Sequence, residues 1–297
     1  MDDRKDLVSV IIPTYNRAHL IKRSAQSVLG QTYKNLELII VDDGSTDNTE
    51  DVVKSLDDER VVYIKQTNQG ACAARNNGID HARGEFIAFQ DSDDVWHNDK
   101  LEKQINCLKE TGADIVFCCL NRIENGKIVE IKGSYFKEGF MQPSTFPSNI
   151  GTQTLVAKYK VFEYEKFDES MPRLQDLELL LRVQKKQKLY CMKLALVDYY
   201  IQDKSISNDK KKLFEACKIL LNKYQNYAPN EHLLIYIIRV AFASDDRRFQ
   251  KVIFDFILKS NISRQAQLRI LAYKFGIYKF YKTIRSLLSV KRCNKRG

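Results

Sequence analysis

The stretch Phe86-Ile87-Ala88-Phe89-Gln90-Asp91-Ser92-Asp93-Asp94 joins an apolar run to three carboxylates within four positions. A short apolar run bounded by polar residues is typical of a buried strand in a parallel sheet. Asp91, Asp93 and Asp94 would then lie at its carboxyl end, where open α/β sheets bind their ligands. Crowded carboxylates repel one another unless a cation relieves the charge, and a hard divalent ion with a substrate phosphate is a common solution. A solvated acidic turn that caps the next helix is the alternative interpretation.

Three β–loop–α units precede this stretch and predict a doubly wound α/β sheet with a nucleotide-type crevice. The expected strands cover residues 7–12, 36–41 and 61–65, and the expected helices begin near residues 18, 45 and 69. We expect the first strand to stop at Pro13, which cannot donate to a ladder. Right-handed crossovers bring successive loops to the same edge of a sheet. The loops expected to converge there contain Thr14–Asn16, Asp42–Asp43, Arg75 and Asp91–Asp94.

The region after the acidic turn is expected to be less regular. Residues 114–121 and 127–131 predict two strands, with a hairpin signal at Glu124-Asn125-Gly126. Residues 133–151 predict a loop long enough to be a lid or a binding loop. A strand over residues 152–158, a helix over 174–186 and a strand over 189–197 would complete this part of the chain.

The composition is that of a soluble globular protein, with 297 residues, 44% hydrophobic and 29% charged. No apolar run approaches the roughly 18 residues that span a bilayer, and the charged first six residues are unlike a signal peptide. Seven cysteines without a CxxC pair favour reduced thiols in a cytoplasmic protein. The four histidines show no metal-ligand spacing and are expected to be structural.

The composition changes after residue 207, which predicts a sheet domain over 1–207 and a basic α-helical region over 208–297. Residues 251–297 carry twelve Lys or Arg and one acid, a formal charge of +11, whereas the first 250 residues sum to −1. Residues 277–290 have the pattern of a basic amphipathic helix, which suits an anionic membrane surface on the cytosolic side. The alternative is that its apolar stripe packs on the sheet domain.

Five motifs, taken in order, resemble the family 2 inverting glycosyltransferases, which use nucleotide sugars on the GT-A fold. They are Val10-Ile11-Ile12-Pro13-Thr14-Tyr15-Asn16, Ile40-Val41-Asp42-Asp43-Gly44-Ser45-Thr46-Asp47, Ala73-Ala74-Arg75-Asn76-Asn77-Gly78, Asp91-Ser92-Asp93-Asp94 and Leu174-Gln175-Asp176-Leu177-Glu178. The resemblance covers about residues 7–200 and implies a GT-A-type mixed sheet with a Rossmann-like nucleotide-binding half. The QxxRW motif of the family's processive synthases is absent, which favours transfer of a single sugar.

The resemblance also implies roles for individual residues. Asp43 would accept the uracil N3–H, and Asp93 would ligate Mg²⁺ or Mn²⁺ at the diphosphate, where a metal neutralises charge on the leaving group. Asp176 matches the general base, although Gln175 stands where many relatives have an acid. The residues expected to contact the nucleotide are Pro13, Thr14, Tyr15, Asn16, Asp43, Arg75 and Asp91.

Each of these assignments has a structural alternative. Asp43 can be a turn residue, Arg75 a surface ion-pair partner, and Asp176 a helix-start carboxylate that the helix dipole favours. The aromatic residues Tyr15 and Trp96 can be core packing, and for Trp96 this alternative is preferred.

The expected function is a metal-dependent inverting glycosyltransferase that uses a UDP-sugar and a saccharide or lipid-linked acceptor in cell-surface polysaccharide synthesis. One alternative is a magnesium-dependent phosphotransfer protein of doubly wound fold, with Asp42, Asp43 and Asp91 around the ion. It would need a Lys and a Ser or Thr at later strand ends, where no convincing pair occurs. Another alternative is a non-catalytic nucleic-acid-binding module that uses the basic tail, although no nucleic acid is expected as a partner.

Overall fold

The computed structural model describes residues 5–143, 145–147, 150–201, 209–224, 231–242 and 250–251. The chain divides into two compact units, Met1–Asn208 and Asp209–Gly297. The assignment of a catalytic domain to 1–207 and of a basic helical region to 208–297 stays a prediction. The expected amphipathic helix over 277–290 lies outside the described residues, as does the basic tail from residue 252 onward.

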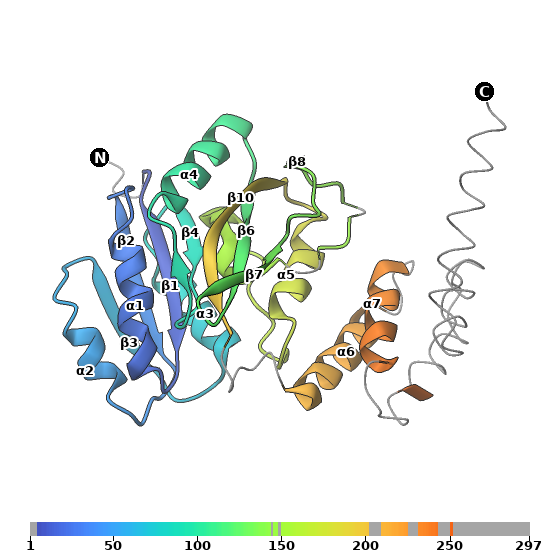
Figure 1. Ribbon diagram of the computed structural model, residues 1–297, viewed down its shortest axis with the longest axis horizontal. Coiled ribbons are helices and arrows are strands. Elements are labelled where there is room, and N and C mark those ends of the chain that lie inside the picture. Colours follow the sequence, from blue (N-terminus) through green and yellow to red (C-terminus); the bar gives the residue numbers. More distant parts are fainter. Residues whose placement is uncertain are drawn as a thin grey trace. The chain divides into compact units, whose positions relative to one another are not determined.

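The first part of the first unit alternates strands and helices, which cover both faces of a parallel sheet (Figure 1). Its elements are β1 (Val8–Thr14), α1 (Ala18–Leu29), β2 (Leu36–Asp42), α2 (Thr49–Lys54), β3 (Val61–Lys65), α3 (Ala71–His81) and β4 (Phe86–Phe89). The strands lie in the order β3-β2-β1-β4, and each pairs with its neighbour in parallel. β2 and β4 are buried along their whole length, as expected for apolar strands between two helical layers.

β1 continues past the proline at which we expected it to stop. Pro13 pairs with Val41 of β2, whereas the pairing of β1 with β4 ends at Ile11 and Phe89. The backbone of Pro13 faces the β4 side, as that of Ile11 does, so its missing N–H removes no ladder bond. The predicted stop at Pro13 is therefore wrong: β1 ends at Thr14, two residues beyond the expected end at residue 12.

The rest of the first unit makes the sheet mixed, as predicted. The strands are β5 (Val95–Trp96), β6 (Ile115–Glu124), β7 (Lys127–Lys132), β8 (Gly139–Phe140), β9 (Leu155–Lys158) and β10 (Leu189–Tyr200). The helices are α4 (Lys100–Thr111) and α5 (Gln175–Val183), with short 3-10 turns η1 (Thr152–Thr154) and η2 (Tyr159–Val161). β9 runs antiparallel between β4 and β6, and β10 runs parallel to β6.

Two predictions for this region need correction. Residues 152–158 begin with η1 before β9 starts, because the chain must turn to enter the sheet in the antiparallel direction. Residues 133–151, expected to form a loop, contain β8, in which Phe140 pairs with Tyr190 of β10.

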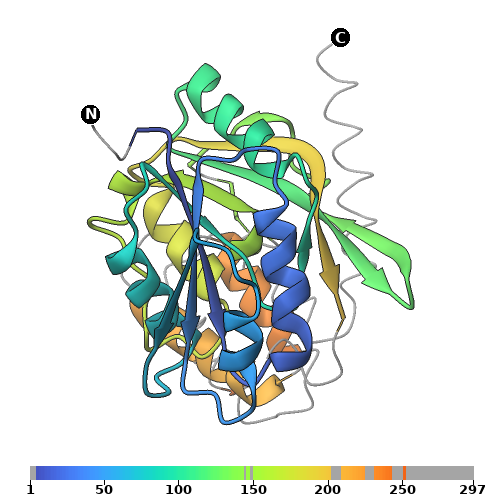
Figure 2. The ribbon, with the colours of Figure 1, turned by 90° about the vertical axis from the view of Figure 1, so that its left-hand side faces the viewer.

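β6 and β7 form a hairpin that projects from the sheet (Figure 2, green). Asn125 and Gly126 have φ values of 50° and 73°, which the predicted turn requires and which Asn and Gly tolerate best. β9 pairs with β6 residues 115–117, and β7 pairs with residues 120–124, so both strands lie along the same side of β6. In the described part of the chain β7 pairs only with β6, so its outer edge is open.

Apolar clusters lie on both faces of the sheet. Ile21 of α1 and Leu101 of α4 pack on the first face, which we call the α1 face. Ala74 of α3 and Leu179 of α5 pack on the second, which we call the α5 face. Trp96 belongs to the α1-face cluster and is 3% exposed, so its preferred assignment to the core is confirmed.

The second unit contains α6 (Lys210–Tyr224) and α7 (Glu231–Phe242) among its described residues. None of the helices in the described part of the chain combines the length and the apolar character that a bilayer crossing requires. The described cysteines are all buried free thiols: Cys72, Cys107, Cys118, Cys119, Cys191 and Cys217.

Candidate active site

The loops that follow β1 and β2 are joined by hydrogen bonds at the carboxyl edge of the sheet. The N–H of Asp43 donates to the Thr14 carbonyl at 2.8 Å. The N–H of Asn16 donates to Ser45 Oγ, and Asn16 Oδ1 accepts from the N–H of Thr46, each at 2.8 Å. Asn16 has a φ of 52°, a left-handed conformation that Asn adopts more readily than most residues. Its bonds to the second loop give Asn16 a structural role beside the predicted nucleotide contact.

The two carboxylates at the end of β2 are held by protein donors. Asp42 accepts from the Ser45 N–H at 2.7 Å and from the Tyr63 hydroxyl at 2.6 Å. Asp43 accepts from Gln66 Nε2 and from the N–H groups of residues 69 and 70, each at 2.8 Å. A carboxylate has about four lone-pair positions. Asp43 therefore fixes the entry to α3 and retains about one position for a ligand.

The end of β1 offers two groups for a nucleoside. Thr14 is 3% exposed, and its hydroxyl is buried without a hydrogen-bond partner. Buried hydroxyls are usually paired, so an unpaired one beside a surface loop indicates a ligand or a water. Tyr15 is 46% exposed, which shows that the alternative of core packing is wrong and leaves its ring available for stacking.

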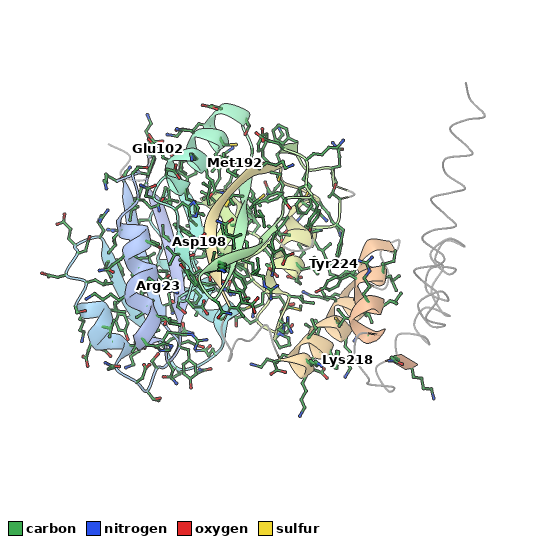
Figure 3. All side chains as sticks on the ribbon, viewed as in Figure 1. Arg23, Glu102, Met192, Asp198, Lys218 and Tyr224 are labelled. Atoms are coloured by element: carbon green, nitrogen blue, oxygen red, sulfur yellow. The ribbon has the colours of Figure 1, made fainter. Side chains whose placement is uncertain are left out.

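Side chains of α1 donate hydrogen bonds to the backbone of the acidic turn, residues 91–94. Ser24 Oγ donates to the Asp91 carbonyl at 2.8 Å, and Arg23 Nη2 donates to the Asp93 carbonyl at 2.6 Å. Figure 3 shows Arg23 on α1, where it also lies 4.1 Å from the centre of the Tyr200 ring. Since the carbonyls face α1, the turn can present its side chains elsewhere.

Asp94 differs from the other two carboxylates of the turn. It is fully buried and accepts from Gln153 Nε2 at 3.0 Å and from the Tyr200 N–H at 3.2 Å. Burial raises the pKa of Asp94 well above its ordinary value, and the neighbouring Asp91 raises it further. Asp94 therefore ties the turn to η1 and to the end of β10.

Arg75 joins three of the five motifs. Its Nη2 donates to Asp91 Oδ1 at 2.8 Å, and its Nη1 donates to Gln175 Oε1 at 2.9 Å. The side chain is 8% exposed, so the alternative of a surface ion pair is wrong. Its buried Nε has no hydrogen-bond partner, although the guanidinium lies 5.5 Å from the centre of the Phe167 ring. Arg75 thus brings α3, the acidic turn and the start of α5 together.

Asp176 lies in the first turn of α5, next to Gln175. Burial raises the pKa of Asp176, while the Leu177 N–H and Arg75 oppose the shift. Leu174, just before the helix, has a φ of 59°, a strained value for a large side chain. This backbone conformation starts α5 so that Gln175 and Asp176 meet the sheet edge.

Asp93 is half-buried and has few partners. Burial raises the pKa of Asp93, and Asp91 raises it further, while Arg17 and Arg23 lower it. No Lys, Arg or His in the described ranges lies within ion-pair distance of its carboxylate. The described residues contain no group of three or more His, Cys, Asp and Glu side chains that would hold a metal by themselves.

Some groups at this edge were not found from the sequence. The sequence assigned no role to Gln175, whose Oε1 accepts the hydrogen bond from Arg75. His97 Nε2 lies 3.0 Å from Asp198 Oδ1, which also accepts from Asn121 Nδ2 at 2.9 Å (Figure 3 labels Asp198). Asn121 and His97 lie 77 and 101 residues before Asp198 in the chain, so no local sequence motif predicts these contacts.

Comparison with protein families gives a match over residues 9–169 to the model described as Glycosyl transferase family 2. The chain is 32% identical over 243 residues to the UDP-Glc:alpha-D-GlcNAc-diphosphoundecaprenol beta-1,3-glucosyltransferase WfgD of Escherichia coli, covering 80% of this chain and 94% of that protein. It is 35% identical over 219 residues to the putative teichuronic acid biosynthesis glycosyltransferase TuaG of Bacillus subtilis, covering 71% and 85%. An uncharacterized glycosyltransferase of Rickettsia felis is 36% identical, with 61% of this chain matched to only 31% of that longer protein.

Solved structures show the same fold. TarS residues 1–349 of S. aureus, in complex with UDP-GlcNAc, superpose with a TM-score of 0.70 at 18% identity, covering 96% of this chain and 92% of that one. The mannosyltransferase PcManGT of Pyrobaculum calidifontis, in complex with GDP-Man and Mn²⁺, gives a TM-score of 0.56 at 16% identity, covering 93% and 86%. The predicted GT-A type of mixed sheet is confirmed by this likeness.

Proposed function

Because the chain belongs to glycosyl transferase family 2, we propose that it moves a single sugar, with inversion, from a nucleoside diphosphate sugar to a saccharide or lipid-linked acceptor. Family membership was predicted from the five motifs and is confirmed, and with it the enzyme class. The proposal extends to the donor, the acceptor, the metal and the roles of individual residues.

The observation that carries the proposal is the double contact of Arg75 with Asp91 and Gln175. In an inverting displacement the base must lie within hydrogen-bond reach of the acceptor oxygen, on the side of the sugar carbon opposite the donor phosphates. Arg75 fixes the acidic turn against the residue that precedes Asp176. One buried side chain therefore sets the distance between the donor carboxylates and the base.

Asp176 acts as the general base in this proposal. It takes the proton of the acceptor hydroxyl as that oxygen bonds to the anomeric carbon, and the bond from this carbon to the diphosphate oxygen breaks. The electron pair leaves with the nucleoside diphosphate, and a single displacement inverts the carbon. The raised pKa of Asp176 makes it a stronger base than an exposed aspartate, which suits proton transfer near neutral pH.

Asp93, assisted by Asp91, fits a divalent metal. Mg²⁺ and Mn²⁺ sites at substrate phosphates use one or two carboxylates, so a cluster of three protein ligands is not needed. Burial and Asp91 raise the pKa of Asp93, and a bound cation would stabilise its ionised form. The chemistry supplied by the ion, when bound, is neutralisation of charge on the departing diphosphate.

The nucleoside end of the donor is assigned to the loops after β1 and β2. Tyr15 offers an exposed ring for stacking, Thr14 an unpaired hydroxyl, and Asp43 one remaining acceptor position for the uracil N3–H. Pro13 and Asn16 shape the loop around them. The complexes of TarS with UDP-GlcNAc and of PcManGT with GDP-Man and Mn²⁺ support a nucleotide sugar and a metal, and we favour a UDP-sugar.

The acceptor side is assigned from the relatives. WfgD is named as a transferase to a diphosphoundecaprenol-linked sugar and TuaG as a putative teichuronic acid transferase, which supports a role in cell-surface polysaccharide synthesis. A lipid-linked acceptor would place the protein in the cytoplasm, at the cytosolic face of the membrane.

Residues 277–297 supply the basic segment for this contact with the membrane. Ending the chain after Gly276 should abolish sedimentation with anionic liposomes at low salt and leave donor binding intact. Unchanged sedimentation would contradict the anchor.

The phosphotransfer alternative is disfavoured by the end of β2. It needs Asp42 and Asp43 as ligands of Mg²⁺, but their oxygens already accept five hydrogen bonds from the protein. The nucleic-acid alternative rests only on the basic tail, outside the described residues.

The test of the proposed function is thermal shift with a panel of nucleotide sugars, with and without Mn²⁺. A ligand that binds the folded state raises the melting temperature by mass action, so the true donor should give the largest shift and should need the metal. If no UDP-sugar, GDP-sugar or other nucleotide sugar shifts the melting temperature with Mn²⁺ present, the donor assignment is wrong.

A further inference from the structure

Residues 166–175, which we call the connecting segment, lie along one side of α3 and lead into α5. Three residues of α3 that are spaced four apart contact this segment, so they lie on the same side of the helix. The contacts are an ion pair, a pair of amide hydrogen bonds and a long thiol–carbonyl contact. They join Asp80 to Lys166, Asn76 to Phe167 and Cys72 to Met171. α3 therefore holds the segment that leads to the proposed base.

Asn76 binds both polar groups of the Phe167 backbone. Its Oδ1 accepts from the Phe167 N–H, and its Nδ2 donates to the Phe167 carbonyl, each at 2.9 Å. Nδ2 also donates to Glu169 Oε1 at 2.9 Å, so the amide uses three of its roughly four hydrogen-bond positions. Asn76 directly follows Arg75 in α3. The helix turn that carries the guanidinium therefore also fixes the backbone of Phe167.

The ring of Phe167 is held by a second aromatic residue and lies beside Arg75. It packs edge-on against Phe89 of β4, with the ring centres 5.2 Å apart, and it is buried. The guanidinium of Arg75 lies 5.5 Å from the centre of the Phe167 ring, within the range of a cation–π contact. Such a contact is stronger where water is excluded, as it is around the buried Arg75 side chain.

This contact also accounts for the nitrogen of Arg75 that lacks a hydrogen bond. Nη1 and Nη2 donate to Gln175 and Asp91. Nε is buried and has no hydrogen-bond partner in the part of the chain that the structure describes. Buried N–H groups are nearly always paired, and an aromatic ring is a weak acceptor for them. The ring of Phe167 is therefore the group that compensates Nε.

We propose that Phe167 is a positioning residue that fixes the plane of the Arg75 guanidinium. In that plane Arg75 binds Asp91 and Gln175 together, so the inference rests on the proposed function, in which Arg75 sets the distance from the donor carboxylates to Asp176. The two hydrogen bonds restrain only the Nη atoms, and the guanidinium could turn about them without a third contact. Phe167 acts through Arg75 and touches neither substrate.

Phe162 provides a matched control for Phe167. Its ring is also buried and packs edge-on against Phe89, at 5.3 Å, but among the described residues it takes part in no cation–π contact. Phe167→Leu and Phe162→Leu should therefore lower the melting temperature by similar amounts. Only Phe167→Leu should lower kcat, by about 10–100-fold, because a small misplacement far from the chemistry can cost that much. UDP affinity should change far less than kcat, since the geometry matters most in the transition state.

A second readout needs no activity, which separates this inference from failure of the proposed function. In the full chain with isotope-labelled arginine, the Nε–H resonance of Arg75 is assigned by its loss in Arg75→Lys. Protons above the face of an aromatic ring are shifted upfield, so this resonance should lie upfield of those of exposed arginines. It should return to the ordinary position in Phe167→Leu and stay in place in Phe162→Leu. Asn76→Ala, which frees the Phe167 backbone and leaves both rings, should reduce the upfield shift and lower kcat.

Two results would overturn the inference. One is an equal kcat in Phe167→Leu and Phe162→Leu at comparable melting temperatures. The other is an Arg75 resonance at the same position in the original chain and in Phe167→Leu, which would show that the guanidinium does not rest on this ring. Asn76→Ala gives the same two comparisons if Phe167→Leu does not fold, and the resonance decides alone if no sugar is transferred.

Discussion

Aspartates follow two strands, β2 and β4, and their hydrogen-bond partners differ between the two places. At the end of β2, Asp42 and Asp43 accept five hydrogen bonds from protein donors and brace the loops around them. At the end of β4, Asp91 has Arg75 as its ion-pair partner, and the pKa of Asp93 is raised by burial. The same residue type braces loops at the end of β2 and, in our proposal, binds a cation at the end of β4.

This difference shows how to distinguish a carboxylate that binds a ligand from one that stabilises the fold. A carboxylate whose lone pairs are filled by backbone and side-chain donors stabilises the fold and has little left for a ligand. A carboxylate that is partly withdrawn from water beside another acid, and that lacks protein donors, destabilises the fold unless a ligand compensates the cost. The predictions below test this contrast between the ends of β2 and β4.

The largest expected effect is at Asp93. Asp93→Ala should lower kcat about 10³-fold or more in saturating Mn²⁺, because charge stabilisation by a metal contributes several kcal/mol. Asp93→Asn keeps the shape without the charge and should be nearly as damaging. Asp51→Ala, at an exposed aspartate of α2, is the matched control. Turnover of either Asp93 variant at the original rate would show that the assignment of Asp93 as the metal ligand is wrong.

Asp176 should separate chemistry from donor binding. Asp176→Asn should reduce kcat about 10²–10⁴-fold, the usual cost of losing a general base, and leave UDP affinity unchanged. The base must be deprotonated, so the raised pKa of Asp176 should move the acidic limb of the kcat profile above the ordinary carboxyl range. Calorimetry with UDP and a pH series of kcat provide the measurements. An equal loss of UDP binding would assign Asp176 to scaffolding.

The ends of β2 and β4 should give opposite stability effects. Asp43→Ala leaves donors from Gln66 and from residues 69 and 70 unpaired and should lower the free energy of unfolding by about 1–3 kcal/mol. Asp93→Asn should raise the free energy of unfolding in metal-free buffer. A folded-state pKa above the unfolded value gives stability that is present at low pH and lost as pH rises through the folded pKa. Urea titrations at several pH values would show this loss in the original chain and less of it in Asp93→Asn.

The end of β1 should show the smallest effect. Tyr15→Ala should weaken UDP binding about tenfold, within the range that base–aromatic stacking contributes, with little change in stability because the ring is 46% exposed. Tyr15→Phe should retain most of the affinity. A large fall in melting temperature in Tyr15→Ala would instead make this ring part of the framework.

The parallel half of the sheet was predictable from the sequence because its signals are local. Apolar strands such as Leu36–Asp42 and the alternation with helices depend on neighbouring residues. β5 was missed because two residues, Val95 and Trp96, carry no periodicity, and they pair with β10 about 100 residues later. β8 was missed for the same reason, since Gly139 and Phe140 depend on the partner strand.

The candidate site shows the same limit. Sequence motifs named Asp91, Asp93 and Asp176, but only the fold reveals which acids are already satisfied. Asp94 stands beside Asp93 with the same side chain, and its hydrogen bonds to Gln153 and to the Tyr200 N–H place it in the framework. Those contacts span 59 and 106 residues, beyond the reach of any local pattern.

The bonds of Asn16 to the loop after β2 have a consequence for engineering this protein. Asn16 accepts from Thr46 and donates to Ser45, so the two loops share one set of hydrogen bonds. Grafting the first loop of a relative with another nucleotide preference would leave the second loop without its partner. Residues 13–17 and 43–47 are best exchanged as one cassette, and single-loop chimaeras should be less stable than the paired exchange.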